Sequence, residues 1–241
     1  MTNIRNAVKA AAASGERIRG VFMTYPAPAV IEVLARAVKL DFVYLDGEHG
    51  CFDWSDISTA SITAERWGLT LIARVPDRSV STITRYLDRG VVGIVAPHIE
   101  TVQDAEEVVA AAYFAPLGKR SFGFGRPQYG KGSGSLSDYA AEFNARISVS
   151  LMIESRAGLD NIADIARVPG IDYLSFGLHD LSQDLGCVGD RTHASVTEKV
   201  ERAKLAIRSA GKPVREDFMN FCWINDALIE GASLKLGSAG N

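Results

Sequence analysis

Several ionisable side chains are crowded into one short stretch of the sequence, Asp41-Phe-Val-Tyr-Leu-Asp-Gly-Glu-His-Gly50. The first half of this stretch is apolar and favours a strand, with no glycine or proline between residues 42 and 45. The second half carries Asp46, Glu48 and His49 between two glycines. A strand that ends in ionisable groups on a glycine-bounded turn is typical of the carboxyl edge of the sheet in α/β enzymes. The alternative is a polar loop whose aspartate caps the next helix.

Other charged side chains follow apolar runs elsewhere in the chain. Each comes at or just after the end of a run that we predict to be a strand, and they are Arg74, His98, Glu154, His179 and Asp180. Because the carboxyl ends of parallel strands meet at one edge of a sheet, we expect these side chains to lie close together. Any one of them could be a helix cap or a surface charge, but caps and surface charges would not be expected at so many strand ends.

Two of these residues are carboxylates that suit a hard divalent cation. Glu154 and Asp180 would come from neighbouring strands, and with water they would make an oxygen site for Mg²⁺ or Mn²⁺. Such an ion can polarise a 2-oxo acid and stabilise the enolate formed from it. The alternative is that Glu154 pairs with Arg156 or Arg74 and binds no metal.

The remaining groups suggest substrate binding and proton transfer. The forked guanidinium of Arg74 is suited to a carboxylate or carbonyl oxygen. His49, oriented by Asp46, would be the acid/base, because a neutral imidazole titrates near working pH. A structural role for His49 is the alternative. Cys51 lies beside His49, and we consider a small semi-buried cysteine more common than a reactive thiol there.

The elements that must position these residues alternate along the chain. Strands are predicted at 20–24, 41–46, 69–75, 91–96, 147–153, 171–176, 211–214 and 232–236. Helices are predicted at 3–14, 29–39, 53–67, 80–89, 102–112, 138–146, 157–167, 181–185, 194–209 and 217–230. This alternation indicates parallel strands joined by crossover helices. The fold class is therefore α/β, a (β/α)8 TIM barrel whose eighth helix is absent.

Length and local composition define the domain. At 241 residues the chain matches one barrel, so residues 1–241 are predicted to form a single (β/α)8 domain. Glycine and proline are concentrated in a long loop at about 114–137, which interrupts the alternation. Loops this long inside a compact domain are usually functional. We interpret it as an active-site loop or lid, with a surface insertion or an oligomer contact as the alternatives.

Charge and cysteine content exclude several classes of protein. The net charge is −3 with acids and bases interspersed, so no nucleic-acid or membrane partner is indicated. The N-terminus lacks the apolar core of a secretory signal, and no run approaches the about 20 apolar residues that span a bilayer. The three cysteines show no CxxC spacing, which argues against a disulfide framework and a thiolate zinc site. A cytoplasmic protein is expected.

Several of these motifs, taken in order, resemble the HpcH/HpaI aldolase/citrate lyase family, the class II pyruvate aldolases. The resemblance covers most of the chain. The matching segments are residues 45–50, 73–76, 86–97, 118–123, 152–155, 161–172 and 177–186.

The resemblance implies a metal-dependent lyase. The expected reaction is the reversible cleavage of a 4-hydroxy-2-oxo acid to pyruvate, or a related 2-oxo acid, and an aldehyde. Glu154 and Asp180 would hold the divalent metal, Mg²⁺ or Mn²⁺, that stabilises the enolate. Arg74 would bind the oxo acid, and Asp46 and His49 would form an acid/base dyad acting through metal-bound water. Barrels of this family assemble as homo-oligomers, trimers or hexamers, often by exchanging the last helix.

Two positions depart from the family pattern in the expected substrate site. Met152 stands where many of these aldolases carry a glutamine that touches pyruvate, and Leu178-His179 replaces a small or proline-containing pair before Asp180. Gly177, His179 and Met152 would line the substrate site with Arg74.

Two other functions use the same barrel. The first is a lyase or thioesterase acting on an acyl-CoA, which would need a basic surface. The candidate cluster for that surface is Lys119, Arg120, Arg126 and Lys131. The second is a non-catalytic barrel, and the intact set of Asp46, His49, Arg74, Glu154 and Asp180 argues against it.

Overall fold

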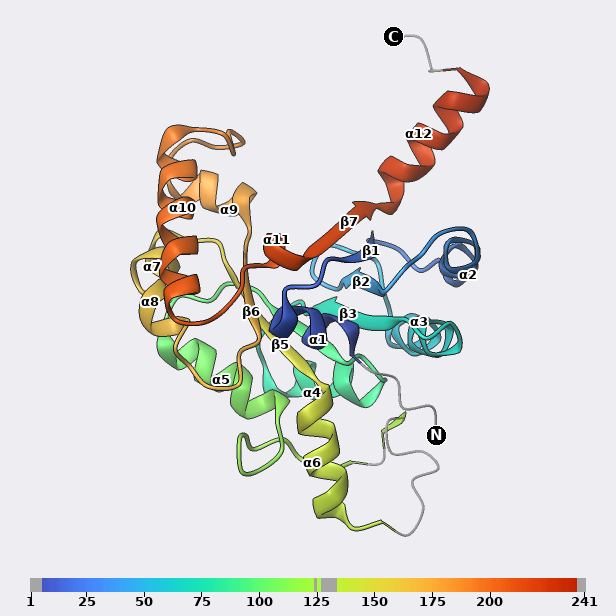
Figure 1. Ribbon diagram of the computed structural model, residues 1–241, viewed down its shortest axis with the longest axis horizontal. Helices are drawn as coiled ribbons and strands as arrows, with labels where there is room; N and C mark the ends of the chain where they lie inside the picture. The colour runs from blue at the N-terminus through green and yellow to red at the C-terminus, as the bar shows by residue number, and fades with distance from the viewer. Residues whose placement is uncertain (1–5, 124, 127–133, 238–241) are drawn as a thin grey trace.

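The computed structural model describes residues 6–123, 125–126 and 134–237. Its strands form one sheet in the order β6-β5-β4-β3-β2-β1-β7, and neighbouring strands are parallel (Figure 1). The strands are β1 Ile18–Met23, β2 Phe42–Asp46, β3 Thr70–Arg74, β4 Gly93–Ala96, β5 Ser148–Ile153, β6 Tyr173–Phe176 and β7 Met219–Trp223. The sequence predicted the first six of these strands to within three residues at each end.

Helices connect the strands, and most of them cover the outside of the curled sheet (Figure 1). They are α1 Ala7–Ser14, α2 Pro28–Ala37, α3 Trp54–Arg66, α4 Val80–Asp88, α5 Val102–Ala112, α6 Leu136–Arg146, α7 Arg156–Asp160, α8 Ile162–Ile165, α9 Leu178–Asp184, α10 Ala194–Ser209, α11 Arg215–Phe218 and α12 Ile224–Leu236. Side-chain caps fix several starts, as at α3, where Asp53 accepts from the backbone N–H of Asp56. This alternation confirms the predicted (β/α) barrel class.

The strands separate two apolar layers. On β2, Val43 and Leu45 pack outward against the helices, whereas Phe42 and Tyr44 face the inside of the curled sheet. Val8 of α1 belongs to the inner cluster. Because successive side chains on a strand point to opposite faces, every second residue of β2 faces the inside of the sheet, including Asp46 at the end of the strand.

The C-terminal region differs from the prediction. Of the strand predicted at 211–214, only Val214 pairs, through an isolated parallel bridge to Leu174 on β6. The helix predicted at 217–230 is wrong over its first half, since residues 219–223 form β7 beside β1. Aromatic packing explains the pairing: the ring centroid of Phe22 lies 5.7 Å from that of Phe221 and 4.4 Å from that of Trp223.

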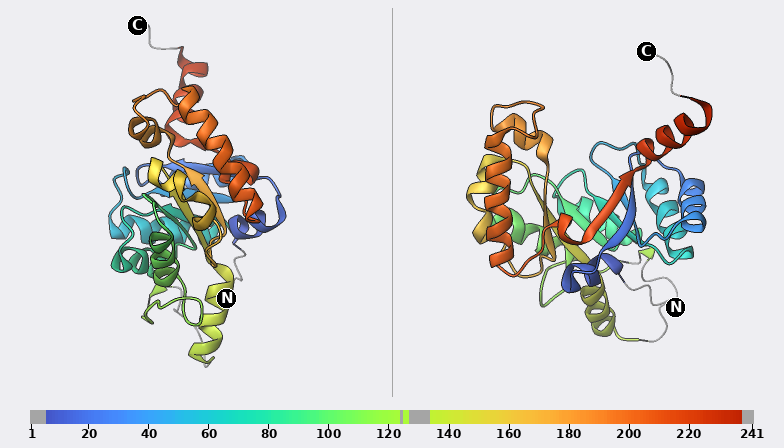
Figure 2. Two further views of the ribbon diagram at one scale, coloured as in Figure 1. Left: turned by 90° about the vertical axis from the view of Figure 1, so that its left-hand side faces the viewer. Right: turned by 45° about the horizontal axis from the view of Figure 1, so that its top comes forward.

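The final predicted strand is also wrong, because residues 232–236 belong to α12. The edge of the sheet beside β1 is already occupied by β7, so no pairing partner is free there for a further strand. α12 points away from the rest of the molecule and does not fold back over the sheet (Figures 1 and 2). A helix, α12, thus follows the strand that lies beside β1, but within the described residues it does not pack on the barrel.

The glycine-rich segment begins by packing on α4. Arg120 is buried and donates to Asp88, the last residue of α4, at 2.7 Å. Residues 124 and 127–133 of the loop predicted at 114–137 lie outside the described residues, so the lid stays a prediction. In the part of the chain that is described, no helix is both long and apolar enough to traverse a bilayer.

Candidate active site

Several charged side chains of the inner face lie near the carboxyl ends of β2, β3 and β5. Asp46 ends β2 and lies in register with Arg74, which ends β3. Glu154 follows β5 directly, two residues after Met152. The two-residue repeat of a strand puts each of these side chains on the face that bears Tyr44, so the structure brings together the predicted Asp46, Arg74, Met152 and Glu154.

Asp46 and Arg74 form a buried, forked ion pair. Arg74 Nε donates to Oδ1 at 2.9 Å and Nη2 donates to Oδ2 at 2.6 Å. Burial alone would lower the pKa of Arg74, but the hydrogen bond and charge of Asp46 raise it above its ordinary value. Asp46 Oδ1 also accepts from the backbone N–H groups of Glu48 and His49, which folds the turn after β2. The pair therefore fixes the guanidinium rigidly on the inner rim.

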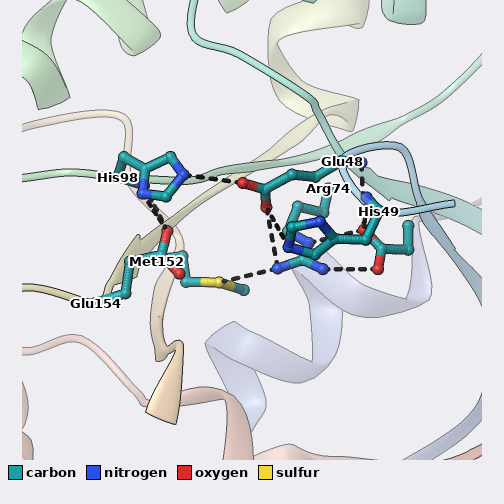
Figure 3. A network of polar contacts seen from close by, with 7 residues as sticks. Glu48, His49, Arg74, His98, Met152 and Glu154 are labelled. Atoms are coloured by element: carbon teal, nitrogen blue, oxygen red, sulfur yellow. Dashed lines mark hydrogen bonds and ion pairs between the residues drawn. The ribbon is translucent and has the colours of Figure 1, made fainter. Parts of the chain in front are cut away.

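Glu48 and His98 extend this pair across the site. Glu48 Oε2 lies 3.0 Å from Arg74 Nη1, and Glu48 Oε1 lies 2.9 Å from His98 Nε2. On its other side His98 contacts Glu154, with Nδ1 3.2 Å from Oε1. Figure 3 shows the continuous network that results. Both ring contacts are hydrogen bonds only when both nitrogens carry a proton.

The sequence marked Glu48 and His98 as residues at strand ends but gave neither a role. Their adjacency depends on the curvature of the sheet, which brings the turn after β2 opposite the end of β4. Their positions directly after β2 and β4 were the available signal, because charged residues at the carboxyl ends of barrel strands commonly belong to the active site.

Glu154 is a buried carboxylate with one oxygen unused. Its side chain is 2% exposed, and Oε1 accepts from the backbone N–H of His98 at 2.7 Å. Oε2 has no hydrogen-bond partner. Burial raises the pKa of the Glu154 carboxyl; contacts with His98 oppose that rise, and the charges of Glu48 and Asp180 add to it. The alternative pairing of Glu154 with Arg74 is wrong, because Arg74 is held by Asp46 and Glu48.

The residues after β6 face Glu154 Oε2. A Cβ added at Gly177 would overlap this oxygen, so the glycine leaves room for the carboxylate in its present position. His179 and Asp180 follow in the first turn of α9, and both are exposed. The charge of Asp180 is close enough to raise the pKa of Glu154. The structure thus places Asp180 three residues after Gly177, the glycine that packs against Glu154.

A divalent cation fits these carboxylates. A divalent cation held by Glu154 and Asp180 would satisfy the unpartnered, buried Oε2 of Glu154 and would offset the repulsion from Asp180. Within the described residues no group of three or more His, Cys, Asp or Glu side chains forms a complete metal site. Two carboxylates suffice for Mg²⁺ or Mn²⁺ when water and substrate supply the other ligands.

His49 lies at the mouth of the site. Its side chain is 66% exposed, and Nε2 is 4.0 Å from Glu48 Oε2. The contact that the structure shows between His49 and Asp46 runs through the backbone N–H of His49. The imidazole–carboxylate dyad therefore stays a prediction. Cys51 donates from Sγ to the carbonyl of Thr24, a structural contact.

The surface predicted for a CoA ester is largely used within the protein. Arg120 is buried against Asp88, and Arg126 donates to Ser61 and pairs with a carboxylate of α3. Lys119 is exposed, and Lys131 lies outside the described residues. The described residues of this cluster therefore offer one unpaired surface cation, which argues against a CoA ester.

Comparisons with known proteins agree with the observed fold. The profile of the HpcH/HpaI aldolase/citrate lyase family matches residues 19–225. A hydroxypyruvate/pyruvate aldolase from Roseovarius nubinhibens is 31% identical over 86% of this chain and 80% of its own. A 5-keto-4-deoxy-D-glucarate aldolase from Salmonella paratyphi A is 31% identical over the same shares. In three dimensions the chain is similar to the HpcH/HpaI aldolase from Desulfitobacterium hafniense, with a TM-score of 0.85, 24% identity, and coverage of 94% of this chain and 93% of that one.

Proposed function

The chain belongs to the HpcH/HpaI aldolase/citrate lyase family, and from this premise we propose that it reversibly cleaves a 4-hydroxy-2-oxo acid to pyruvate, or a related 2-oxo acid, and an aldehyde. It is an aldolase, a carbon–carbon lyase. The main support for the proposed substrate is the arrangement of charged side chains on the inner rim of the sheet. There a fixed guanidinium, which suits a carboxylate or carbonyl oxygen, lies on one network with a buried carboxylate whose Oε2 is free.

Glu154 and Asp180 would hold the divalent metal, Mg²⁺ or Mn²⁺. When bound, such a cation supplies Lewis-acid polarisation of the 2-oxo group. Support for this ligand pair comes from the free Oε2 of Glu154 and from the nearby charge of Asp180.

Arg74 would bind the oxo acid through Nη1. The other two guanidinium nitrogens are held by Asp46, whereas Nη1 faces Glu48 at 3.0 Å and the sulfur of Met152 at 3.9 Å. The oxo acid would replace Glu48 at Nη1, while Met152 contributes an apolar wall. Gly177 and His179 would complete the substrate site from the start of α9.

His49 would take the proton of the 4-hydroxyl group, since its imidazole is accessible at the mouth of the site. Loss of that proton turns the hydroxyl-bearing carbon into the aldehyde, as the C3–C4 bond breaks and its electron pair moves toward the 2-oxo group. The product regains a proton at C3 and leaves as pyruvate. The reverse sequence forms the same bond.

The proposed reaction predicts metal-dependent release of pyruvate. We expect a panel of 4-hydroxy-2-oxo acids to yield pyruvate with Mg²⁺ or Mn²⁺, and we expect EDTA to reduce the rate by at least about 100-fold, because polarisation of the 2-oxo group is lost. Coupled reduction of pyruvate measures the rate. Full activity in EDTA contradicts the metal role, and cleavage of CoA esters alone contradicts the substrate class.

We also propose that the enzyme is a homo-oligomer, a trimer or hexamer. α12 projects from the barrel with apolar side chains in solvent, and Ile229, Leu234 and Leu236 are 63%, 85% and 87% exposed. An apolar helix with no cover of its own suits packing against a second copy. The free thiols at Cys51, Cys187 and Cys222 suit the proposed cytoplasmic setting.

The oligomer predicts a mass change when α12 is charged. We expect light scattering to give a multiple of 26.0 kDa for the wild type, and a smaller multiple for Ile229→Glu/Leu234→Glu, because burying a carboxylate at an interface is unfavourable. Lys235→Glu, at an exposed position on the same helix, is the control and should keep the wild-type mass. A monomeric wild type at micromolar concentration contradicts the proposal.

A further inference from the structure

His98 has an unusual backbone conformation. Its φ is 54°, and among the described residues it is the one non-glycine residue with positive φ. The left-handed region is unfavourable for a residue with a Cβ, because the Cβ comes too close to the following carbonyl oxygen. In this conformation the backbone N–H of His98 donates to Glu154 Oε1 at 2.7 Å. Strain of this kind persists where surrounding contacts impose it, and it is concentrated at functional sites.

The ring of His98 adds two contacts to the backbone contact. Nδ1 lies 3.2 Å from Glu154 Oε1, the same oxygen that accepts from the backbone, and Nε2 lies 2.9 Å from Glu48 Oε1 (Figure 3). The imidazole therefore bridges two carboxylates that come from different strands. The ring is 58% exposed, so burial in the core does not account for its placement.

These contacts determine which oxygen of Glu154 is free. Oε1 receives both contacts from His98, and Oε2 is left buried with no hydrogen bond, against Gly177. Rotation of the carboxylate would break the contacts at Oε1. Oε2 is thus held toward the segment that carries Asp180.

We propose that His98 is a positioning residue that presents Oε2 of Glu154 to the divalent cation and ties Glu154, through Glu48, to Arg74. Glu154, the proposed metal ligand, and Arg74, which would bind the oxo acid, would then stay at a fixed distance from each other. This inference rests on the proposed function for the identity of the cation. Residues that orient a metal ligand through hydrogen bonds commonly change metal affinity when replaced.

Two variants separate the contacts of His98. His98→Gly accepts the left-handed backbone and keeps the N–H donor, but it loses both ring contacts. His98→Asn also tolerates this backbone, and its amide nitrogen takes the place of Nδ1, so that the contact to Glu154 is kept and the contact to Glu48 is lost. His193→Asn, at the exposed cap of α10, is the matched control.

The test is a titration of the full-length, metal-free protein with Mn²⁺, in which the paramagnetic resonance signal of free Mn²⁺ is followed without substrate. We expect His98→Gly to raise the Kd for Mn²⁺ by about 10- to 100-fold, and we expect His98→Asn and the control to stay within about threefold of wild type. The melting temperature of His98→Gly should not fall, because the glycine removes backbone strain.

The outcomes distinguish this inference from the proposed function. If the wild type binds Mn²⁺ and releases pyruvate while His98→Gly binds Mn²⁺ equally well, the positioning role is overturned and the aldolase stands. If His98→Gly and His98→Asn lose affinity for Mn²⁺ equally, the contact between His98 and Glu154 is not the cause, and the positioning role is also overturned. If the wild type binds no Mn²⁺, the metal role and the positioning role fall together.

Discussion

Glu154→Gln is expected to lower kcat/KM for the cleavage of a 4-hydroxy-2-oxo acid by about 10³-fold, equivalent to about 4 kcal/mol of transition-state stabilisation. The amide keeps the size of the side chain and can still accept from His98 through Oε1. It removes the negative charge from the buried Oε2, the proposed metal oxygen. The measurement is the rate of pyruvate release at saturating Mn²⁺, together with a Mn²⁺ titration. Activity within tenfold of wild type would remove Glu154 from the metal site.

The same variant should not lose stability when metal is absent. Burial raises the pKa of Glu154 in the folded protein, so the ionised form is disfavoured there and folding is favoured by the protonated form. This contribution is fully present below the unfolded pKa and is lost as pH rises through the folded pKa. Glutamine resembles the protonated form, so Glu154→Gln should melt higher than wild type near neutral pH.

The pH dependence checks this explanation. In EDTA, the difference in melting temperature between Glu154→Gln and wild type should shrink as pH falls from about 8 towards about 4, because Glu154 is increasingly protonated in both the folded and the unfolded state. Calorimetry at several pH values gives the comparison. A difference that is constant with pH would show that titration of Glu154 is not its cause.

Arg74→Ala should reduce both activity and stability strongly. Asp46 is 2% exposed at its side chain and loses a forked partner, so the free energy of unfolding should fall by about 3–5 kcal/mol. Activity should fall by at least about 10²-fold, because the nitrogen proposed to hold the oxo acid is removed. Denaturant unfolding and steady-state kinetics measure the two effects.

A second substitution separates these effects. Asp46→Asn in the Arg74→Ala background removes the uncompensated charge while keeping a side-chain oxygen for the backbone N–H groups of Glu48 and His49. We expect the double variant to recover much of the lost stability, because the two residues are directly coupled. Activity should stay low. Recovery of activity with stability would mean that Arg74 acts only by maintaining the fold.

Local pattern was enough for the first six strands and for the predicted residues of the inner rim. On β2 and β3 the two-residue repeat by itself puts Asp46 and Arg74 on the inside, at strand ends that a parallel sheet must align. Because the inner face is buried, its residues recur at every second position of each strand, and Asp46 and Arg74 could be recognised from this repeat in the sequence. The assignment of this family likewise followed from motifs distributed along the sequence and is confirmed by the match over residues 19–225.

The C-terminal strand could not be predicted in the same way. Residues 219–223 carry aromatic and small side chains that suit either a helix or a strand, and the choice was made by pairing with β1 at the other end of the chain. The packing of Phe221 and Trp223 against Phe22 stabilises that pairing. The pairing of β7 with β1 joins residues about 200 positions apart, so no pattern within residues 219–223 indicates it.

The chemistry available to this protein follows from its residue types and their spacing: carboxylates, imidazoles and a guanidinium stand at the ends of successive parallel strands. Which of these groups touch one another depends on the three-dimensional fold. Glu48 meets Arg74 and His98, and His98 meets Glu154, because the sheet curls and brings separate strand ends within hydrogen-bonding distance. Charge and periodicity are local properties of a chain, whereas distances between strand ends depend on how the whole sheet bends.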